Sequence, residues 1–403
     1  MKYKGIVISD IHVGAFDLQK LYTEYTEVFL NYIQRMERLD FLIITGDFFD
    51  HHFMLSDPGS VIAHAMMRDL ITICKEKNTV IRIVYGTESH ECGQYDVLSV
   101  LQMYDKIEIV KYAKEEELLP GLNVLYLPEE YLLDRDKYYE KYFSKIKHYD
   151  YVFGHGVIRE VMKVAAVQMG NKEPEGNGKR KKVPVFTTAE LNKICKGQVY
   201  FGHYHNMENI DDKIFSVGSF SRWEFGQEGE KGFFELKCNI EKGKYSQLFI
   251  ENHLAEKYVT VAYGYDDKVF TSNENLMEAL NRVDTLIKDK VIDHVRYIIN
   301  VPTTVENPEA VINLVKERYK FNKNVKTDIS HGYIVEKKKQ EKEKIDSENE
   351  KFSFIFDKNL PVEEKTSRFI SISYNKSIPS DTVSKILFLS LNEFLDEEKS
   401  NDE

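Results

Sequence analysis

The strongest constraint on the fold is a pattern that recurs in the first half of the chain. A short apolar run ends near a glycine, and Asp or His follows at once. The clearest case is the run 41–44 (Phe-Leu-Ile-Ile), which passes through Thr45 and Gly46 into Asp47. Unbroken apolar runs of this length are typical of parallel strands buried on both faces. Ligand sites of open α/β sheets lie at the carboxyl ends of such strands, so we expect Asp47 to lie at a functional site.

Four other strand-like runs end in the same way. The polar residues that follow them are Asp10 and His12, then Ser89, His90 and Glu91 after Gly86, then His155 after Gly154, and finally His203 and His205 after Gly202. Because the carboxyl ends of parallel strands meet at one edge of a sheet, the sequence predicts that these side chains gather into one site.

The first half of the chain has the alternation of an α/β fold. Segments 18–36 and 59–77 carry apolar residues at the i, i+3, i+4 spacing of a helix with one buried face, and they lie between predicted strands. This β-α-β-α-β order predicts a doubly wound sheet with helices on both faces. Strand-like runs at 214–217, 232–237 and 247–250 predict an antiparallel group that closes a first domain, 1–253.

The rest of the chain has a different pattern. Residues 254–333 alternate short strand and helix patterns and predict a smaller α+β capping domain that recognises the substrate. Residues 334–403 open with an almost purely charged run, 336–351, and end in an apolar-faced helix, 380–395. That helix is expected either to bind a partner protein or to pack back on its own capping domain.

Composition excludes several classes of protein. The chain has 403 residues and a net charge of −11, which argues against a protein that coats nucleic acid through overall basicity. No apolar run reaches the ~18–20 residues of a membrane span, and no signal-peptide pattern precedes the first strand. Four cysteines without CxxC spacing predict neither a zinc knuckle nor a disulfide framework, and we expect a cytoplasmic protein.

The clustered residue types predict a metal centre. Mixed imidazole and carboxylate ligands suit Mn, Fe or Zn better than Ca. Asp10 and His12 are two residues apart and can reach one ion from a single turn, as can His203 and His205, while Asp47 is placed to bridge. Two ions ~3.5–4 Å apart activate water and clamp the oxygens of a phosphoryl group during in-line displacement.

These five blocks, in this order, resemble the calcineurin-like metallophosphoesterases. The resemblance implies a metallophosphoesterase sheet sandwich with two divalent ions, Mn²⁺ first and Mg²⁺ or Fe²⁺ as alternatives. By this resemblance the first ion is held by Asp10, His12, Asp47 and His205, and the second by Asp47, His155 and His203. His90 is implied to protonate the leaving oxygen, oriented by Glu91. We expect Asp50, next to this machinery, to orient a ligand rather than bind an ion.

The third block departs from the family pattern, Gly-Asn-His-Asp/Glu, in which the Asn carbonyl binds the second ion. Here the sequence is Gly86-Thr87-Glu88-Ser89-His90-Glu91, so Ser89 stands in the Asn position after a two-residue insertion. Ser89 is therefore the expected ligand, with Thr87 or Glu88 as alternatives.

Residues after the last block narrow the resemblance. The segments 216–222 (Ser-Val-Gly-Ser-Phe-Ser-Arg) and 230–233 (Glu-Lys-Gly-Phe) look like a signature of the SbcD-type DNA double-strand-break nucleases. The altered third block and the compact length are similar to phage-encoded members of that family. That family implies a homodimeric nuclease subunit, an exonuclease on duplex ends and an endonuclease on single strands, acting in DNA repair and recombination. It also implies an SbcC-type SMC-like ATPase partner bound through the C-terminal tail. In a phage-encoded member the location is the host cytoplasm and nucleoid.

Two other functions are possible, and the role of one basic loop is undecided. A phosphatase or phosphodiesterase for small substrates explains the metal residues but not the signature, and a scaffold that binds DNA ends or the ATPase without cutting is supported only by Ser89. The basic run Lys179, Arg180, Lys181 and Lys182 is either a DNA-phosphate contact or a solvated loop.

Overall fold

The computed structural model describes residues 1–161, 183–263, 273–301, 308–331, 360–374 and 379–385. The chain divides into two compact units. The first contains Met1–Val261 with Ala279–Arg296 and Asn322–Lys326, and the second contains Ala262–Glu278, Tyr297–Phe321 and Thr327–Glu403. The charged run 336–351, most of the predicted tail helix and the basic run 179–182 lie outside the described residues.

The elements of the first 251 residues follow in chain order. They are β1 (Lys2–Ile8), α1 (Leu18–Glu24), the π-helix η1 (Tyr25–Leu30), α2 (Asn31–Arg35), β2 (Phe41–Thr45), α3 (Pro58–Glu76), β3 (Val80–Val84), α4 (Glu88–Glu91), the 3₁₀-helices η2 (Gln94–Val97) and η3 (Ser99–Met103), β4 (Ile107–Val110), β5 (Lys114–Leu119), β6 (Leu122–Leu127), α5 (Arg135–Phe143), β7 (Tyr149–His155), β8 (Val157–Ile158), β9 (Val185–Phe186), α7 (Thr188–Ile194), β10 (Cys195–Gly202), β11 (Glu208–Asp211), β12 (Ile214–Ser216), β13 (Gly232–Asn239), the 3₁₀-helix η4 (Ile240–Lys242) and β14 (Lys244–Glu251).

Most of these strands form two six-stranded sheets. The first has the order β14-β13-β1-β2-β3-β4, and the second has the order β11-β12-β10-β7-β6-β5. The centre of each sheet is parallel: β1, β2, β3 and β4 in the first, and β12, β10, β7 and β6 in the second. The antiparallel pairs are β13 with β1 and with β14, β11 with β12, and β5 with β6, while the parallel strand β4 forms the second edge of the first sheet.

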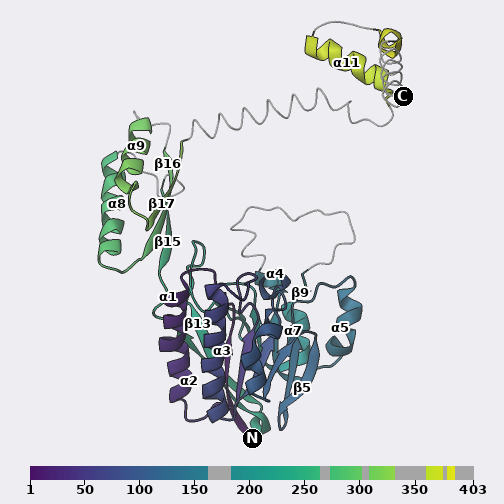
Figure 1. Ribbon diagram of the computed structural model, residues 1–403, viewed down its shortest axis with the longest axis vertical. Coiled ribbons are helices and arrows are strands. Elements are labelled where there is room, and N and C mark those ends of the chain that lie inside the picture. The colour runs from purple at the N-terminus through teal and green to yellow at the C-terminus, as the bar shows by residue number, and fades with distance from the viewer. Residues whose placement is uncertain (162–182, 264–272, 302–307, 332–359, 375–378, 386–403) are drawn as a thin grey trace. The chain divides into compact units, whose positions relative to one another are not determined.

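The two sheets pack face to face. One buried cluster joins Val7 and Ile43 of the first sheet to Tyr126, Phe153 and Tyr200 of the second. Successive residues of a strand point to opposite faces, so Ile6, Ile8, Leu42 and Ile44 face away from this layer and pack with α1, η1, α2 and α3. On the other side, Leu125, Val152 and Phe201 pack with α5 and α7. Figure 1 shows these two groups of helices on opposite sides of the strands.

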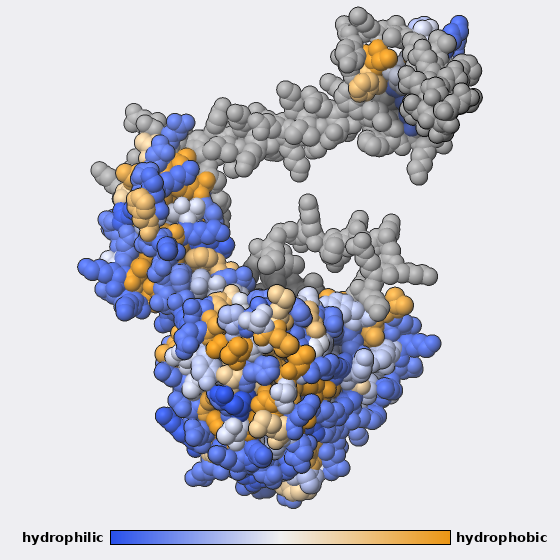
Figure 2. Space-filling view, in the orientation of Figure 1, coloured by the Kyte–Doolittle hydropathy of each residue, from blue (hydrophilic) through white to orange (hydrophobic). Residues whose placement is uncertain are grey.

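The α/β class is therefore confirmed, with one difference in the layering. The sequence predicted helices on both faces of a sheet, whereas each sheet has helices on one face and the other sheet on its second face. The predicted helices 18–36 and 59–77 correspond to α1–η1–α2 and to α3. Of the predicted antiparallel group, 232–237 and 247–250 pair as β13 and β14, whereas 214–217 was placed wrongly: it forms β12 of the second sheet, parallel to β10. Figure 2 shows a mostly hydrophilic surface over the first unit, with hydrophobic residues around the middle of the face shown.

The later part of the chain has the elements expected from its pattern. They are β15 (Tyr258–Tyr263), α8 (Asn273–Lys288), β16 (His294–Val301), α9 (Pro308–Tyr319) and β17 (Val325–His331). A further helix, α11 (Val362–Tyr374), was not predicted. The strands form a sheet in the order β15-β16-β17. Along β16, residues alternate between buried and half-buried, the pattern of a strand with one face toward a core. In the described residues, no helix is long and apolar enough to cross a membrane.

Candidate metal centre

The candidate centre lies where the carboxyl ends of six parallel strands meet. In the first sheet Asp10 follows β1, Asp47 follows β2 and Thr87 follows β3, while in the second sheet Glu129 follows β6, His155 ends β7 and His203 follows β10. Backbone hydrogen bonds join the turns after β1 and β2, from Asp10 N to Gly46 O and from His12 N to Asp47 O, both 3.1 Å. Gly46 has φ +87°, and a Cβ there would collide with His155, so the two sheets approach closely at this point.

The backbone at this site is strained. Asp10, His12, Asp47 and His203 have φ values of 47°, 49°, 48° and 93°, in the left-handed region that residues other than glycine rarely adopt. Each such residue costs on the order of 1–3 kcal/mol, and strain of this kind gathers at functional sites. All four were predicted as metal ligands from the sequence alone.

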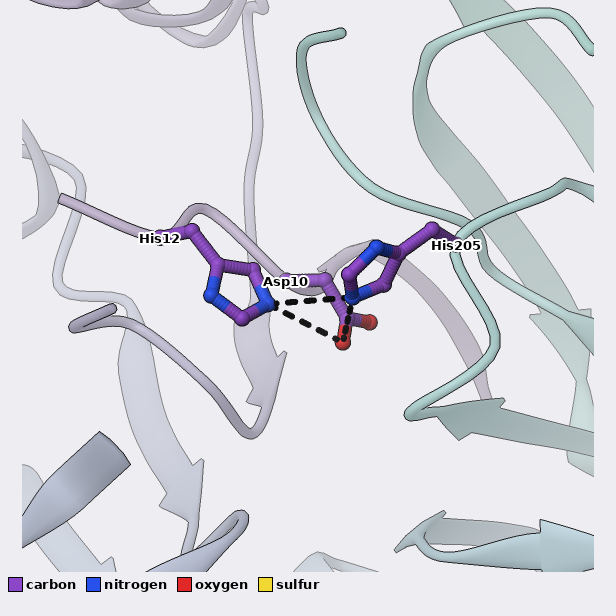
Figure 3. A group of neighbouring side chains, drawn as sticks. All are labelled: Asp10, His12 and His205. Atoms are coloured by element: carbon purple, nitrogen blue, oxygen red, sulfur yellow. Dashed lines mark hydrogen bonds and ion pairs between the residues drawn. The ribbon is translucent and has the colours of Figure 1, made fainter. Parts of the chain in front are cut away.

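One set of donor atoms is drawn in Figure 3. His12 Nε2 and His205 Nε2 are 3.1 Å apart, and each lies 3.8 Å from Asp10 Oδ1. These side chains come from the turn after β1 and the loop after β10, and Asp10 and His12 are buried. Two ring nitrogens and a carboxylate oxygen converging in this way can hold a metal ion.

Neighbouring side chains fix the orientation of this first set. Asp50 Oδ1 lies 3.2 Å from His12 Nδ1, which leaves Nε2 directed at the site, and this is the orienting position expected for Asp50. The side-chain amide of Gln227 lies 2.9 Å from His205 Nδ1. The ring of Trp223 packs on both imidazoles, with centroids 5.0 Å from His12 and 5.1 Å from His205.

A second set comes from the ends of β6, β7 and β10. Glu129 Oε2 lies 3.0 Å from His203 Nδ1 and 3.6 Å from His155 Nε2. His155 Nδ1 lies 2.7 Å from the carbonyl oxygen of Thr45, so its other nitrogen, Nε2, faces the site. Glu129, His155 and His203 can hold a metal ion, as can Asp10, Asp47 and His155.

Asp47 lies between the two sets, and one of its oxygens faces both. Its Oδ2 is 3.7 Å from His12 Nε2 and 3.3 Å from His155 Nε2. The same oxygen is 2.9 Å from His90 Nδ1, and the other, Oδ1, accepts a hydrogen bond of 2.6 Å from Thr87 N. The structure therefore brings Asp10, His12, Asp47, His155, His203 and His205 together, and places His90 beside them with its side chain 32% exposed.

The charges of these buried groups are balanced by one another. Burial opposes a charge on His12, but the neighbouring carboxylates of Asp10 and Asp50 raise its pKa to about 9. Burial also opposes a charge on His155, yet the Asp47 carboxylate raises its pKa to about 10. Asp47 is buried as well, and His155 holds its pKa well below the usual range. By contrast, burial lowers the pKa of His205 to about 4.

Metal binding is therefore expected to release protons and to strengthen as pH rises. At pH 7, His12 and His155 are protonated without an ion, and a ligating imidazole must be neutral, so saturation should release roughly two protons. Affinity for Mn²⁺ should increase between pH 6 and about 9. Calorimetric titrations in buffers of different ionisation enthalpy measure the release. An affinity independent of pH in this range would contradict the ligand roles of these histidines.

Two predicted residues are placed differently from the arrangement that the resemblance implied. Ser89 is exposed on α4, and it belongs to none of the four groups of candidate ligands found among the described residues. Glu91 is buried, and its Oε1 accepts hydrogen bonds from Phe48 N and the Tyr95 hydroxyl rather than from His90, which contacts Asp47. Burial, with the nearby charge of Asp47, raises the pKa of Glu91 to about 8.

Glu129 was missed by reasoning from the sequence. Its signal was present, because the apolar run of β6 ends at Leu127 and is followed by Pro128 and Glu129. Because Glu129 lies two residues beyond the end of β6 and follows no glycine, it does not fit the pattern of the other polar strand ends. Gln227 and Trp223 were also missed, since they reach the histidines from a loop far along the sequence.

Residues of the predicted signature, segments 216–222 and 230–233, contact the loop that carries His205. The buried Lys231 ammonium donates to the carbonyl oxygen of His205 and to Ser219 Oγ. Burial, with the nearby Arg222 charge, lowers the pKa of Lys231 to about 7. Arg222 donates to the backbone carbonyl oxygens of Gln227, Gly229 and Glu256. These residues therefore fix the backbone around a candidate ligand.

Comparison with known proteins adds little to this description. No model of a known protein family matches the chain, and no curated protein matches it. A solved structure is similar over 62% of this chain and 100% of its own length, with 14% sequence identity and a TM-score of 0.32. A likeness of this size carries no argument about fold or function.

Proposed function

We propose that this chain is a metal-dependent phosphodiesterase that cuts DNA, with two divalent ions, Mn²⁺ first, at the centre described above. The observation that carries the proposal is the pair of donor sets that share Asp47 Oδ2, with His90 at the same oxygen. When bound, two such ions lower the pKa of water and stabilise charge on phosphoryl oxygens.

The side chains give this centre an open side and a closed side. Asp10, His12, Asp47 and His155 are almost fully buried, which excludes water from one side. His90, His203 and His205 have side chains 32%, 32% and 25% exposed, so a phosphodiester can approach past them. With Nδ1 of His90 at the Asp47 carboxylate, Nε2 is the nitrogen that can donate a proton to a leaving oxygen.

The choice of DNA as substrate rests on the resemblance to SbcD-type nucleases. Two residues of the signature, Ser219 and Lys231, hold the loop that carries His205. A role beside a candidate metal ligand is what we expect of residues that belong to a nuclease signature. Under this proposal the chain is the nuclease subunit of an SbcCD-like complex in DNA repair, a metallophosphoesterase sandwich that works in the cytoplasm. The capping domain contacts DNA, the tail binds the SMC-like ATPase, and two copies form a dimer.

The test is release of nucleotides from linear duplex DNA with Mn²⁺, beside a small phosphodiester dye. We expect chelator-sensitive release from DNA by the full-length chain. Cleavage of the dye with DNA untouched would instead establish a phosphodiesterase for small substrates. Bound metal without cleavage of either substrate, also in the presence of the ATPase partner, would contradict the nuclease and favour a DNA-end or ATPase scaffold.

A further inference from the structure

Glu129 is a buried carboxylate in the second donor set. Its side chain has 0% exposure. A buried carboxylate is costly unless it is paired or binds a metal ion. Oε1 accepts a 2.5 Å hydrogen bond from the Tyr131 hydroxyl, and Oε2 lies 3.3 Å from Thr87 Oγ1, whose single proton also has Asp47 Oδ2 at 3.1 Å. These two hydroxyls fix the carboxylate with Oε2 directed at the two histidines.

The distances around Glu129 Oε2 are close to those of donor atoms that share one ion. With metal–ligand bonds of about 2.1 Å, neighbouring donors in an octahedral or tetrahedral shell are roughly 3.0 to 3.4 Å apart. Here Oε2 is 3.0 Å from His203 Nδ1 and 3.6 Å from His155 Nε2, and His155 Nε2 is 3.3 Å from Asp47 Oδ2. One carboxylate and two imidazoles, those of Glu129, His155 and His203, therefore converge on one point, and Asp47 Oδ2 lies beside His155.

The second observation is a buried nitrogen that makes no hydrogen bond and is aimed at the same point. The neighbours of His155 Nε2 are two carboxylate oxygens, Asp47 Oδ2 at 3.3 Å and Glu129 Oε2 at 3.6 Å, and the ring is held through Nδ1 and Thr45 O. A buried polar atom without a hydrogen bond is rare in a folded protein and needs an explanation. A metal ion bound between His155 and Glu129 supplies one.

We propose, on the basis of the proposed two-ion centre, that Glu129 is a ligand of the second metal ion and supplies the oxygen that the sequence had assigned to Ser89. Ser89 is exposed on α4, whereas Glu129 enters from the other sheet at the end of β6. The centre then has three carboxylates, Asp10, Asp47 and Glu129, in place of two carboxylates and a neutral oxygen. The additional negative charge binds the second divalent ion more tightly.

A competing role for Glu129 is to orient His203 only. Carboxylates often accept a hydrogen bond from the ring nitrogen that does not bind the metal. The Glu129→Gln variant separates the two roles, because Gln keeps an oxygen acceptor for His203 but loses the charged ligand. Metal analysis and calorimetric titration of the full-length protein with Mn²⁺ give the stoichiometry, and the coupled spectrum of a Mn²⁺ pair in electron paramagnetic resonance reports the second site directly.

We expect wild type to bind two equivalents of Mn²⁺. In Glu129→Gln the affinity for one Mn²⁺ ion should stay unchanged. The affinity for the other ion should fall by more than the ~10–100-fold that is typical when a residue that only orients a ligand is lost. The resonance spectrum of the coupled Mn²⁺ pair should disappear. His203→Ala should lose the same step, and Ser89→Ala should bind like wild type. Circular dichroism and thermal melting check that each variant is folded, and Glu129→Asp should recover part of the affinity.

Two outcomes would overturn the assignment. Wild-type binding of two equivalents by Glu129→Gln would leave Glu129 as an orienting residue, and loss of the second ion in Ser89→Ala would return the ligand role to Ser89. A wild-type protein that binds fewer than two ions would refute both this assignment and the two-ion part of the proposed function. Two bound ions without cleavage of DNA would leave Glu129 as a ligand and refute the nuclease alone.

Discussion

Replacing Asp47 with alanine is expected to remove metal binding at both donor sets and to abolish DNA cleavage. Asp47 Oδ2 lies 3.7 Å from His12 Nε2 in one set and 3.3 Å from His155 Nε2 in the other, so a single substitution takes an oxygen from each. The rate enhancement of a two-ion phosphodiesterase depends on its ions, and we expect a loss of at least about 10⁴-fold. Nucleotide release from duplex DNA and metal content of the purified variant are the two measurements.

The controls for this variant separate metal loss from misfolding. Asp47→Asn keeps the shape of the side chain but loses its charge, and it should also bind metal poorly. Asp96→Ala removes an exposed carboxylate on η2 that pairs with Lys111, and it should leave metal content and cleavage unchanged. A folded Asp47→Ala protein that retains two ions would contradict the bridging position of Asp47.

The candidate ligands could be predicted because each one follows its own strand. Asp10, Asp47, His155 and His203 are adjacent in sequence to buried apolar runs, and parallel strands bring their carboxyl ends to a common edge. This inference needs no knowledge of which strands pair. It also holds when the strands belong to two sheets, because the carboxyl ends of β1, β2 and β3 face those of β6, β7 and β10 in this fold.

The division into two sheets could not be predicted from periodicity. A parallel strand buried on both faces has the same apolar pattern whether a helix or another sheet covers it. Ile43 packs toward the second sheet, while Ile44 packs toward the helices, and their side chains are similar. The edge strand β5 (Lys-Glu-Glu-Glu-Leu-Leu) was not predicted, because its charged residues are typical of solvated edges rather than of buried strands.

The third block shows why position in an aligned motif is a weak guide after an insertion. Residues 88–91 form the short helix α4, which carries His90 to Asp47 while Ser89 is exposed. Neighbours in a helix point in directions about 100° apart, so an inserted residue changes which side chain faces the site. Glu129 is distant from this block in the sequence, but the second sheet brings it beside His155 and His203. It therefore lies close to the site where the motif expects an oxygen ligand from the third block.

Replacing His90 with alanine is expected to leave the metal ions bound and to reduce DNA cleavage by about 10²–10⁴-fold, the usual contribution of a positioned proton donor. The imidazole lies 2.9 Å from Asp47 Oδ2 and is partly exposed toward the open side of the site. The variant keeps Asp10, His12, Asp47, His155, His203 and His205, so metal analysis should match wild type.

The leaving group supplies the sharper test of this role. A nitrophenolate departs without a proton, whereas the sugar oxygen of DNA needs one, so His90→Ala should lose much less activity on a nitrophenyl phosphodiester than on DNA. His148→Ala, which removes an exposed histidine that packs on Tyr149, is the matched control and should cleave both substrates like wild type. An equal loss on both substrates would assign His90 to positioning Asp47 or an ion, and undiminished cleavage of DNA would remove it from the mechanism.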